Sequence, residues 1–395
     1  MKFFQQIGSI SEKQVFRDKP LTDGYAYDRS LLWLTVLMTA FSLLMIYSAS
    51  IVVAAAENGS SWYFFNRQIA FLAIGVLAGF AAFAIGMPRW QRHSKKILLF
   101  ALFLLLLVLV VGRNINGATR WIHVGPANIQ PTEIFKLAII VYMADFLSRK
   151  QEVVREFKKI GWVGIPLGLG VLLIMLEPDF GSTVVTCVIA LGLLFLVELP
   201  VKWFVGLMAF GIVGGLGAVI LSPYRMARVT SFTKPFDDPY GSGYQLTHSL
   251  MAIGRGEWFG VGIGSSLEKR FYLPEAHTDF IFAIIGEEFG FFGLCMLVVS
   301  YGWLVWRAFA IGRQSRELDL FFRAAVAQGI GIWIGIQSFF NIGVNTGVLP
   351  TKGLTLPLMS YGGSSAVMML MCIGLLLRID YDNRRARNGD KNVKE

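Results

Sequence analysis

Residues 31–55 read LLWLTVLMTAFSLLMIYSASIVVAA and contain no charged side chain. A helix needs roughly 20 apolar residues to cross the hydrocarbon core of a bilayer, and this run exceeds that length. It is also too long, and too far from the N-terminus, to be the apolar core of a cleaved signal peptide. We therefore expect it to form the first membrane helix of the protein.

Nine further apolar runs follow the first one. They lie at residues 67–86, 97–112, 132–148, 161–176, 182–198, 203–221, 280–305, 321–344 and 361–378. Each is close to the length that a bilayer core requires. The pattern predicts an all-α polytopic membrane protein with ten transmembrane helices and both termini on one side.

The composition excludes the common classes of soluble protein. Hydrophobic residues make up 55% of the 395 residues, another 42 are glycines, and only 16% are charged, against roughly 25% in soluble domains. This excludes a water-soluble enzyme, a disordered tail protein and a disulfide scaffold. The cysteines, at Cys187, Cys295 and Cys372, lie in apolar runs, and the four histidines are scattered. We expect no zinc site.

Lys and Arg are distributed unevenly between the two sides of the predicted bundle. With the N-terminus inside, the inside segments hold 25 of the 36 basic residues, and the short outside segments hold 5. Short cytoplasmic loops of membrane proteins collect Lys and Arg, so both termini are predicted to be cytoplasmic. The net charge of +10 therefore requires no nucleic-acid partner.

This topology divides the chain into five segments. They are a cytoplasmic N-terminal tail (1–30), helices 1–7 (31–221), a large external loop (222–278), helices 8–10 (279–378) and a basic cytoplasmic C-terminal tail (379–395). A loop as long as the external one is usually functional or disordered. Its stretch YQLTHSLMAIG, at 244–254, can form an amphipathic helical turn on the membrane surface, so we expect the loop to be ordered.

Ionisable side chains at membrane depth are the main functional signal, because each is costly to bury and needs a partner or a cavity. Those predicted at or near the outer face are Arg120, Glu133, Lys136, Asp179, Asp279 and Lys352. We take these six as the candidate site residues. No Walker A loop, HExxH motif, GxSxG elbow or dinucleotide fingerprint accompanies them, so we do not expect ATP-driven transport by this chain alone.

Each candidate also has a structural interpretation. Asp279 precedes the predicted eighth helix and could cap its N-terminus. Glu133 and Lys136 lie three residues apart on one helical face and can pair with each other. Asp179 could start a helix, and the Lys352 side chain could reach lipid head groups.

Two pairs of residues inside predicted helices also have simple packing interpretations. Glu287 and Glu288 lie roughly 12–13 Å along the helix from Asp279, at 1.5 Å per residue. They could form a proton path, but we expect them to have packing partners. Gly331 and Gly335 make a face of small residues that could accept the single membrane helix of another protein.

Seven motifs, in order between residues 30 and 380, resemble the SEDS family (shape, elongation, division and sporulation). They read NGATRWI at 116–122, QPTE at 130–133, EPDFG at 177–181, DDPYGSGYQ at 237–245, YLPEAHTDFIFAIIGEE at 272–288, GVLPTKGLTLP at 347–357 and SYGGSS at 360–365. The motifs around 276–279 and 349–357 look like the division branch rather than the elongation branch. One departure is Thr119, where relatives often carry a second basic residue.

The resemblance implies a ten-helix glycosyltransferase that polymerises lipid II into glycan strands on the outer face of the bacterial cytoplasmic membrane, at the division septum. It implies inverting transfer, with Asp279 as general base for the acceptor hydroxyl and undecaprenyl pyrophosphate as leaving group. Cations would neutralise the pyrophosphate, either side chains or a divalent ion such as Mg²⁺ or Mn²⁺. The implied partners are a class B penicillin-binding transpeptidase and other membrane proteins of the division complex. The substrate-binding candidates are Arg120, Glu133, Lys136, Asp179 and Lys352.

Two other functions stay open at this point. A lipid II flippase or transporter fits the charges inside the membrane, but alternating-access carriers usually contain internal repeats, and none is visible. A non-catalytic division scaffold that recruits a transpeptidase predicts that the outer polar residues are dispensable. Glycan strands formed from lipid II by the purified protein would distinguish an enzyme from both.

Overall fold

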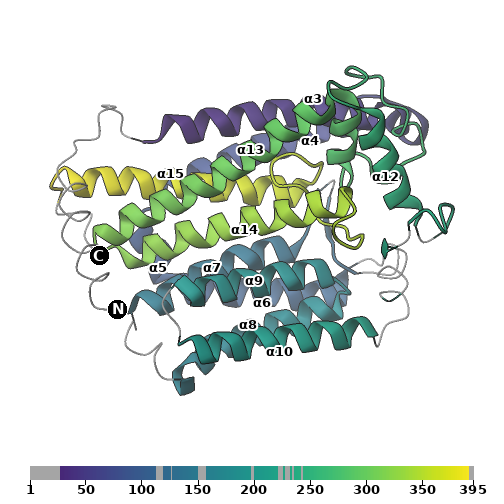
Figure 1. The fold of residues 1–395 in the computed structure, drawn as a ribbon. Helices are drawn as coiled ribbons and strands as arrows, with labels where there is room; N and C mark the ends of the chain where they lie inside the picture. The colour runs from purple at the N-terminus through teal and green to yellow at the C-terminus, as the bar shows by residue number, and fades with distance from the viewer. Residues whose placement is uncertain are drawn as a thin grey trace, which may run out of the picture.

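The computed structural model describes residues 27–112, 119–125, 127–149, 157–196, 200–220, 226, 232–233, 235–241 and 243–390. Within these residues, ten helices of 17 or more residues run side by side (Figure 1). Each of the ten predicted apolar runs overlaps one of them. They are α3 (Arg29–Asn58), α4 (Tyr63–Ala84), α6 (Ser94–Val111), α7 (Pro131–Arg149), α8 (Phe157–Leu176), α9 (Phe180–Leu196), α10 (Val201–Ile220), α13 (Ile281–Glu317), α14 (Phe321–Asn345) and α15 (Gly363–Arg387).

Six of the helices in the described residues are long and apolar enough to cross a bilayer: α3, α4, α6, α13, α14 and α15. Shorter apolar stretches lie in α8, α9 and α10. α7 is different because it carries Glu133, Lys136 and Asp145, all of them buried. Other helices, rather than lipid, therefore surround these charges. The chain is a polytopic helical protein, and ten remains the predicted number of spans.

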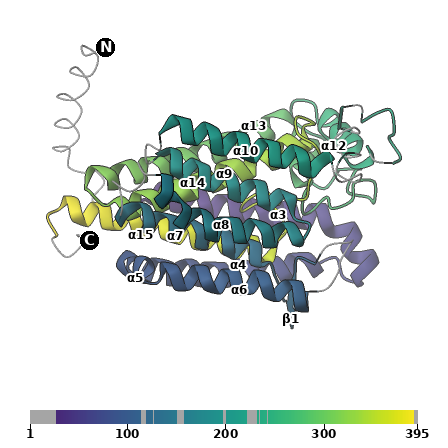
Figure 2. The ribbon, with the colours of Figure 1, turned by 90° about the horizontal axis from the view of Figure 1, so that it is seen from below.

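α14 lies in the middle of the bundle and joins two groups of helices. α3, α4, α13 and α15 lie on one side of it, and α7, α8, α9 and α10 lie on the other (Figure 1). α14 packs against α13 in the first group and against α7 and α9 in the second, and its Trp333 is fully buried. Seen from below, α8 and α10 lie on the near side of the bundle (Figure 2).

α15 continues beyond the apolar run predicted for it and ends at Arg387. The described residues after 379 are therefore largely helical, and the cytoplasmic location of this basic segment stays a prediction. Ion pairs one turn apart explain the extension, because they stabilise a helix outside the apolar region. The Arg384 Nε lies 2.7 Å from the Asp380 Oδ2, and both side chains are buried.

The described residues of the stretch 222–278, which the sequence predicts to be an external loop, include a helix. α12 (Tyr244–Arg255) is the helix expected from residues 244–254, and it packs on α13 and α14. It lies at one end of the bundle, opposite the end of α15 that carries Arg387 (Figure 1). We refer to this end as the α12 end.

The residues that follow α12 pair with a break in α13, which the sequence did not predict. Gly290 has φ 67° and ψ −164° and interrupts the helix. The N–H of Val261 donates to the carbonyl of Glu287 at 2.9 Å, and the N–H of Phe291 donates to the carbonyl of Glu257 at 2.8 Å. The loop backbone thus forms hydrogen bonds with N–H and carbonyl groups that have no partner inside the interrupted helix.

A second element that the sequence did not predict is a short hairpin before α7. Strands β1 (Ile122–Val124) and β2 (Ala127–Ile129) pair antiparallel, with His123 opposite Asn128. The run NGATRWI leads into this hairpin, but its residues up to 118 lie outside the described residues.

Gly331 and Gly335 face α13 of this same chain. A Cβ at Gly331 would lie 3.0 Å from the Cβ of Ala308, and a Cβ at Gly335 would lie 3.2 Å from Val305. The small residues therefore allow α14 to approach α13 closely. The prediction that this face accepts another protein's helix is wrong, because the chain already covers it.

Candidate functional site

Asp279 lies at the α12 end, just before α13, and is half-buried. The residue at the N-cap position of α13 is Phe280, which makes no side-chain cap. The N–H of Ala283 is instead bonded to Oδ1 of Asn345, at 3.1 Å, from the last turn of α14. A residue of another helix therefore caps the first turn of α13, and Phe280 rather than Asp279 stands at the N-cap position.

The segment 352–354 lies across Asp279 and the start of α9. A Cβ at Gly353 would lie 2.8 Å from the Asp279 Oδ2, so only a residue without a side chain lets the carboxylate approach this closely. The preceding residue, Lys352, places its Nζ 3.4 Å from the ring centre of Phe180, the first residue of α9. One segment thus carries the ammonium group and also lies against the Asp279 carboxylate.

Arg120 also reaches the start of α9. Its Nε donates to the carbonyl of Glu177 at 3.3 Å, and its Nη2 donates to the carbonyl of Pro178. Arg120 and Lys352 therefore meet at the N-terminus of α9, where backbone N–H groups add positive potential.

Glu177 is a buried carboxyl group that the sequence analysis quoted in a motif without giving it a role. It is fully buried, and neither carboxyl oxygen has a hydrogen-bond partner among the described residues. Burial, reinforced by the nearby Asp179 and opposed by Arg120, raises the pKa of Glu177 to about 9. At neutral pH this side chain is therefore a neutral acid.

Asp179 caps α9. Its Oδ1 accepts from the N–H of Ser182 at 3.1 Å, and its Oδ2 accepts from the Ser182 hydroxyl at 2.7 Å. This is the geometry of an N-cap, and it supports the structural interpretation of Asp179. Its direct contact with substrate stays a prediction.

Glu133 and Lys136 pair with each other inside the bundle. The Lys136 Nζ lies 2.6 Å from the Glu133 Oε1 and 2.9 Å from the Gln337 Oε1 of α14. Lys136 is fully buried and Glu133 is 3% exposed. The predicted ion pair is confirmed. Gln337 Nε2 also donates to the carbonyl of Thr355, the residue after the segment 352–354, at 2.9 Å.

Glu287 and Glu288 have partners from the stretch 222–278, as we expected. The Arg255 Nη1 lies 2.8 Å from the Glu287 Oε1, and the Lys269 Nζ lies 2.8 Å from the Glu288 Oε1. Ser48 of α3 also donates to Glu288. These two pairs, of which Lys269–Glu288 is buried, hold the loop against the break in α13.

The four residues Arg120, Asp179, Asp279 and Lys352 form what we call the α12-end cluster. His277 lies beside it, in ring contact with Phe64 and Tyr361 at 4.3 and 5.5 Å. Burial lowers the pKa of the His277 imidazole, although Glu275 opposes this, which favours the neutral ring at neutral pH. Sequence spacing gave no sign of these ring contacts.

The described residues offer no group of three or more His, Cys, Asp or Glu side chains that could hold a metal ion. The described side chains therefore do not form a metal site from protein ligands alone. The proposed mechanism uses no metal ion. A requirement for Mg²⁺ or Mn²⁺ stays a prediction.

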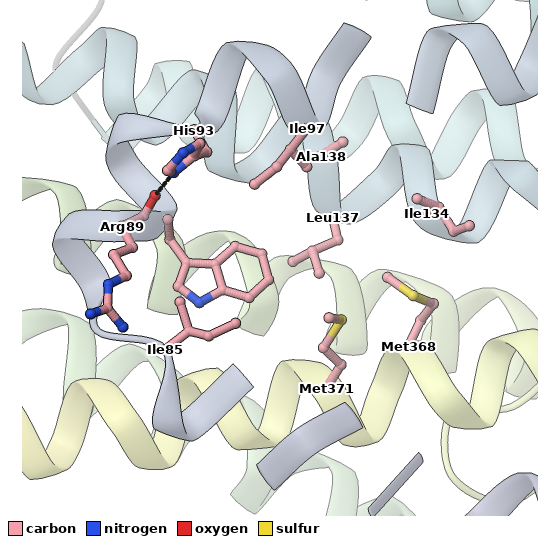
Figure 3. A pocket seen from close by; sticks show the side chains of 10 residues that line it. Ile85, Arg89, His93, Ile97, Ile134, Leu137, Ala138, Met368 and Met371 are labelled. Atoms are coloured by element: carbon pink, nitrogen blue, oxygen red, sulfur yellow. Dashed lines mark hydrogen bonds between the residues drawn. The ribbon is translucent and has the colours of Figure 1, made fainter. Parts of the chain in front are cut away.

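A cavity of about 550 Å³ lies away from the cluster, between α4, α5 (Met87–Arg92), α6, α7 and α15 (Figure 3). Its lining is mostly apolar, including Leu137 and Met371, with Arg89 and His93 together at one side (Figure 3). No carboxylate lines it. Such a lining suits a hydrocarbon chain better than a sugar, which needs hydrogen-bonding groups.

Comparisons with known proteins agree with the resemblance found in the motifs. Residues 29–385 match the family model for FtsW, RodA and SpoVE, described as "Cell cycle protein". A probable peptidoglycan glycosyltransferase FtsW of Neisseria gonorrhoeae is 54% identical, over 94% of this chain and 88% of its own length. The protein of the same description in Aromatoleum aromaticum is 45% identical, over 92% and 90%.

Solved structures share the fold. A chain of a peptidoglycan synthase complex, studied for its structural coordination of polymerization and crosslinking, has a TM-score of 0.75 and 31% identity, over 90% of this chain and 98% of its own. The rod shape determining protein RodA of Thermus thermophilus has a TM-score of 0.67 and 28% identity, over 91% and 98%.

Proposed function

This chain belongs to the family of cell cycle proteins that contains FtsW, RodA and SpoVE, and on that basis we propose how its α12-end cluster polymerises peptidoglycan. The chain is a peptidoglycan glycosyltransferase and a multi-pass membrane protein. Its proposed substrate is lipid II, and its proposed location is the bacterial cytoplasmic membrane at the division septum, with the α12 end outside.

The proposed base is Asp279. Its carboxylate takes the proton of the acceptor hydroxyl, the 4-hydroxyl of the incoming GlcNAc. The hydroxyl oxygen then attacks the anomeric carbon of the growing strand, and undecaprenyl pyrophosphate leaves. A single displacement of this kind inverts the anomeric centre and needs one carboxylate, unlike a retaining mechanism. A positioned base contributes typically about 10²–10⁴-fold to the rate.

The proposed cations are Arg120 and Lys352. Both lie at the N-terminus of α9, where an anion is stabilised by charge and by backbone N–H groups. Negative charge that develops on the departing pyrophosphate is neutralised there. The buried Glu133–Lys136 pair acts at a distance in this proposal, through Gln337 and Thr355, which follows the segment 352–354.

One observation carries the assignment of the base. The Asp279 carboxylate lies against Gly353, the residue after Lys352, and the N–H of Ala283 in the first turn of α13 is bonded to Asn345. A carboxylate held against the segment that carries a cation, at the α12 end of the bundle, is suited to chemistry.

The test is the rate at which purified Asp279→Asn protein forms glycan strands at saturating lipid II. Because Asn345 caps the helix, the substitution should leave the fold and the binding of lipid II unchanged. We expect a rate at least roughly 10²-fold lower than that of the unsubstituted protein. Glu275→Gln, an exposed amide substitution four residues away, is the control. A rate within a few-fold of normal for Asp279→Asn would refute the assignment.

The proposed partner is a class B penicillin-binding transpeptidase, together with other membrane proteins of the division complex. The structural relative from a complex that coordinates polymerization with crosslinking supports this choice. Co-purification of the transpeptidase with this chain from membranes is the test.

A further inference from the structure

Two carboxamides of α14 connect the segments that carry the site residues. Asn341 and Asn345 lie four residues apart, and therefore on one face of the helix. Their exposed fractions are 1% and 0%. Buried amides keep their hydrogen bonds, because an unpaired buried donor or acceptor is costly. The hydrogen-bond partners of Asn341 and Asn345 therefore show which parts of the chain these side chains hold in place.

Asn341 uses its Nδ2 on two different parts of the chain. It donates to the carbonyl of Asp279 at 2.8 Å and to the carbonyl of Leu354 at 2.6 Å. Asp279 precedes α13, and Leu354 follows Gly353 in the segment that lies against the Asp279 carboxylate. One planar amide thus fixes the distance between the backbone of the carboxylate and the backbone of the segment that carries Lys352.

Asn345 has a different set of partners. Its Nδ2 also donates to the carbonyl of Asp279, at 3.0 Å, but its Oδ1 is bonded to the N–H of Ala283. It therefore holds the first turn of α13, and its side-chain bonds among the described residues go to Ala283, Asp279 and Asn341 rather than to the segment 352–354. Asn345 thus caps α13. Asn341 instead bridges the residue before α13 and the segment 352–354.

We propose that Asn341 is a positioning residue for glycosyl transfer, which sets the Asp279 carboxylate and the Lys352 segment at the separation that the reaction needs. This inference rests on the proposed function of Asp279. Asn341 contacts neither reacting group directly and acts through two backbone carbonyls. Displacement of a catalytic group by about 1 Å costs on the order of 10²-fold in rate, so loss of the bridge affects turnover more than binding.

The test compares kcat and KM of purified Asn341→Ala with lipid II. We expect kcat to fall about 10- to 100-fold, while KM stays within a few-fold, because the cations that bind the substrate remain. Combined with Asp279→Ala, the substitution should cause no further loss, since residues that act as a unit are not additive. The matched control is Ser338→Ala on the same helix, whose buried hydroxyl donates only to its own helix, at Ile334.

A second variant covers the possibility that Asn341→Ala folds poorly. Asn341→Ser retains one donor and should keep the fold with an intermediate kcat. A normal kcat in either folded variant, or a raised KM with normal kcat, would overturn the inference. So would failure of both variants to fold, since Asn341 would then be required for folding. An active Asp279→Asn protein would instead refute the proposed function itself.

Discussion

The ammonium group of Lys352 lies 3.4 Å from the ring centre of Phe180, at the N-terminus of α9. A cation at this end of a helix is opposed by the helix dipole, and the aromatic ring compensates for part of that cost. The Asp179 side chain caps the same helix. Because Arg120 reaches this end as well, the α12-end cluster concentrates positive potential where an anionic group of the substrate would bind.

Removal of the Lys352 charge should impair the reaction and leave the fold intact. Lys352→Met keeps the length of the side chain but loses its charge, and we expect glycan synthesis to fall by about 10²-fold, as for loss of one preorganised donor in an active site. Lys352→Arg should retain part of the rate. The measurement is strand formation at saturating lipid II, with melting temperature as the control for folding. Equal rates for Lys352→Met and the unsubstituted protein would contradict this role.

Phe180→Leu tests the contact with Lys352 separately from the charge itself. The substitution keeps an apolar side chain at the start of α9 and removes the ring face, which is worth about 0.5–2 kcal/mol to a nearby cation. We expect a rate between those of Lys352→Met and the unsubstituted protein. A normal rate would show that the ring does not position the ammonium group.

The free energy of unfolding should fall as pH rises from about 4.5 to about 9. Over this range Glu177 keeps its proton in the folded state but loses it in the unfolded state. The pKa of Glu177 is about 9 when folded, against an ordinary value of 4.5. Between these values the unfolded chain binds fewer protons than the folded one, so the free energy of unfolding decreases with rising pH. Glu177→Gln removes this titration. Melting temperatures at about pH 5 and pH 9 should therefore differ less in Glu177→Gln than in the unsubstituted protein.

Gly290→Ala should destabilise the protein strongly. The backbone at Gly290 has a positive φ that a residue with a side chain rarely adopts, and an added Cβ would overlap the backbone of Gly260. We expect a loss of more than about 1 kcal/mol in the free energy of unfolding. The matched control is Gly211→Ala in α10, where an added Cβ meets nothing within 4 Å. A similar melting temperature for both variants would show that the break in α13 is dispensable.

Reporter fusions test the predicted orientation. A fusion after Gln314, in the far end of α13, should report the cytoplasm, and a fusion after Ser242, outside the described residues, should report the external side. The reason is the uneven distribution of Lys and Arg. The opposite result at either position would overturn the topology on which the outer location of the cluster depends.

The sequence alone was sufficient to predict where the long helices lie. Apolar runs of membrane length have few alternatives to a helix, because the backbone must satisfy its own hydrogen bonds in lipid. The pairing of Glu133 with Lys136 was also predictable, since residues three apart share one helical face. The motifs that contain Arg120, Asp179, Asp279 and Lys352 indicated the family, and the structure brings these residues to one end of the bundle.

Only the tertiary structure decided how those residues are held. The first turn of α13 is capped by Asn345, which is 62 positions away from Ala283 in the sequence, and the break at Gly290 depends on the loop backbone that pairs there. The side of α14 that Gly331 faces likewise depends on which helix lies against it. Spacing along one helix determines which of its own residues meet, whereas contacts between distant segments depend on how the helices pack, and no local pattern in the sequence encodes that packing.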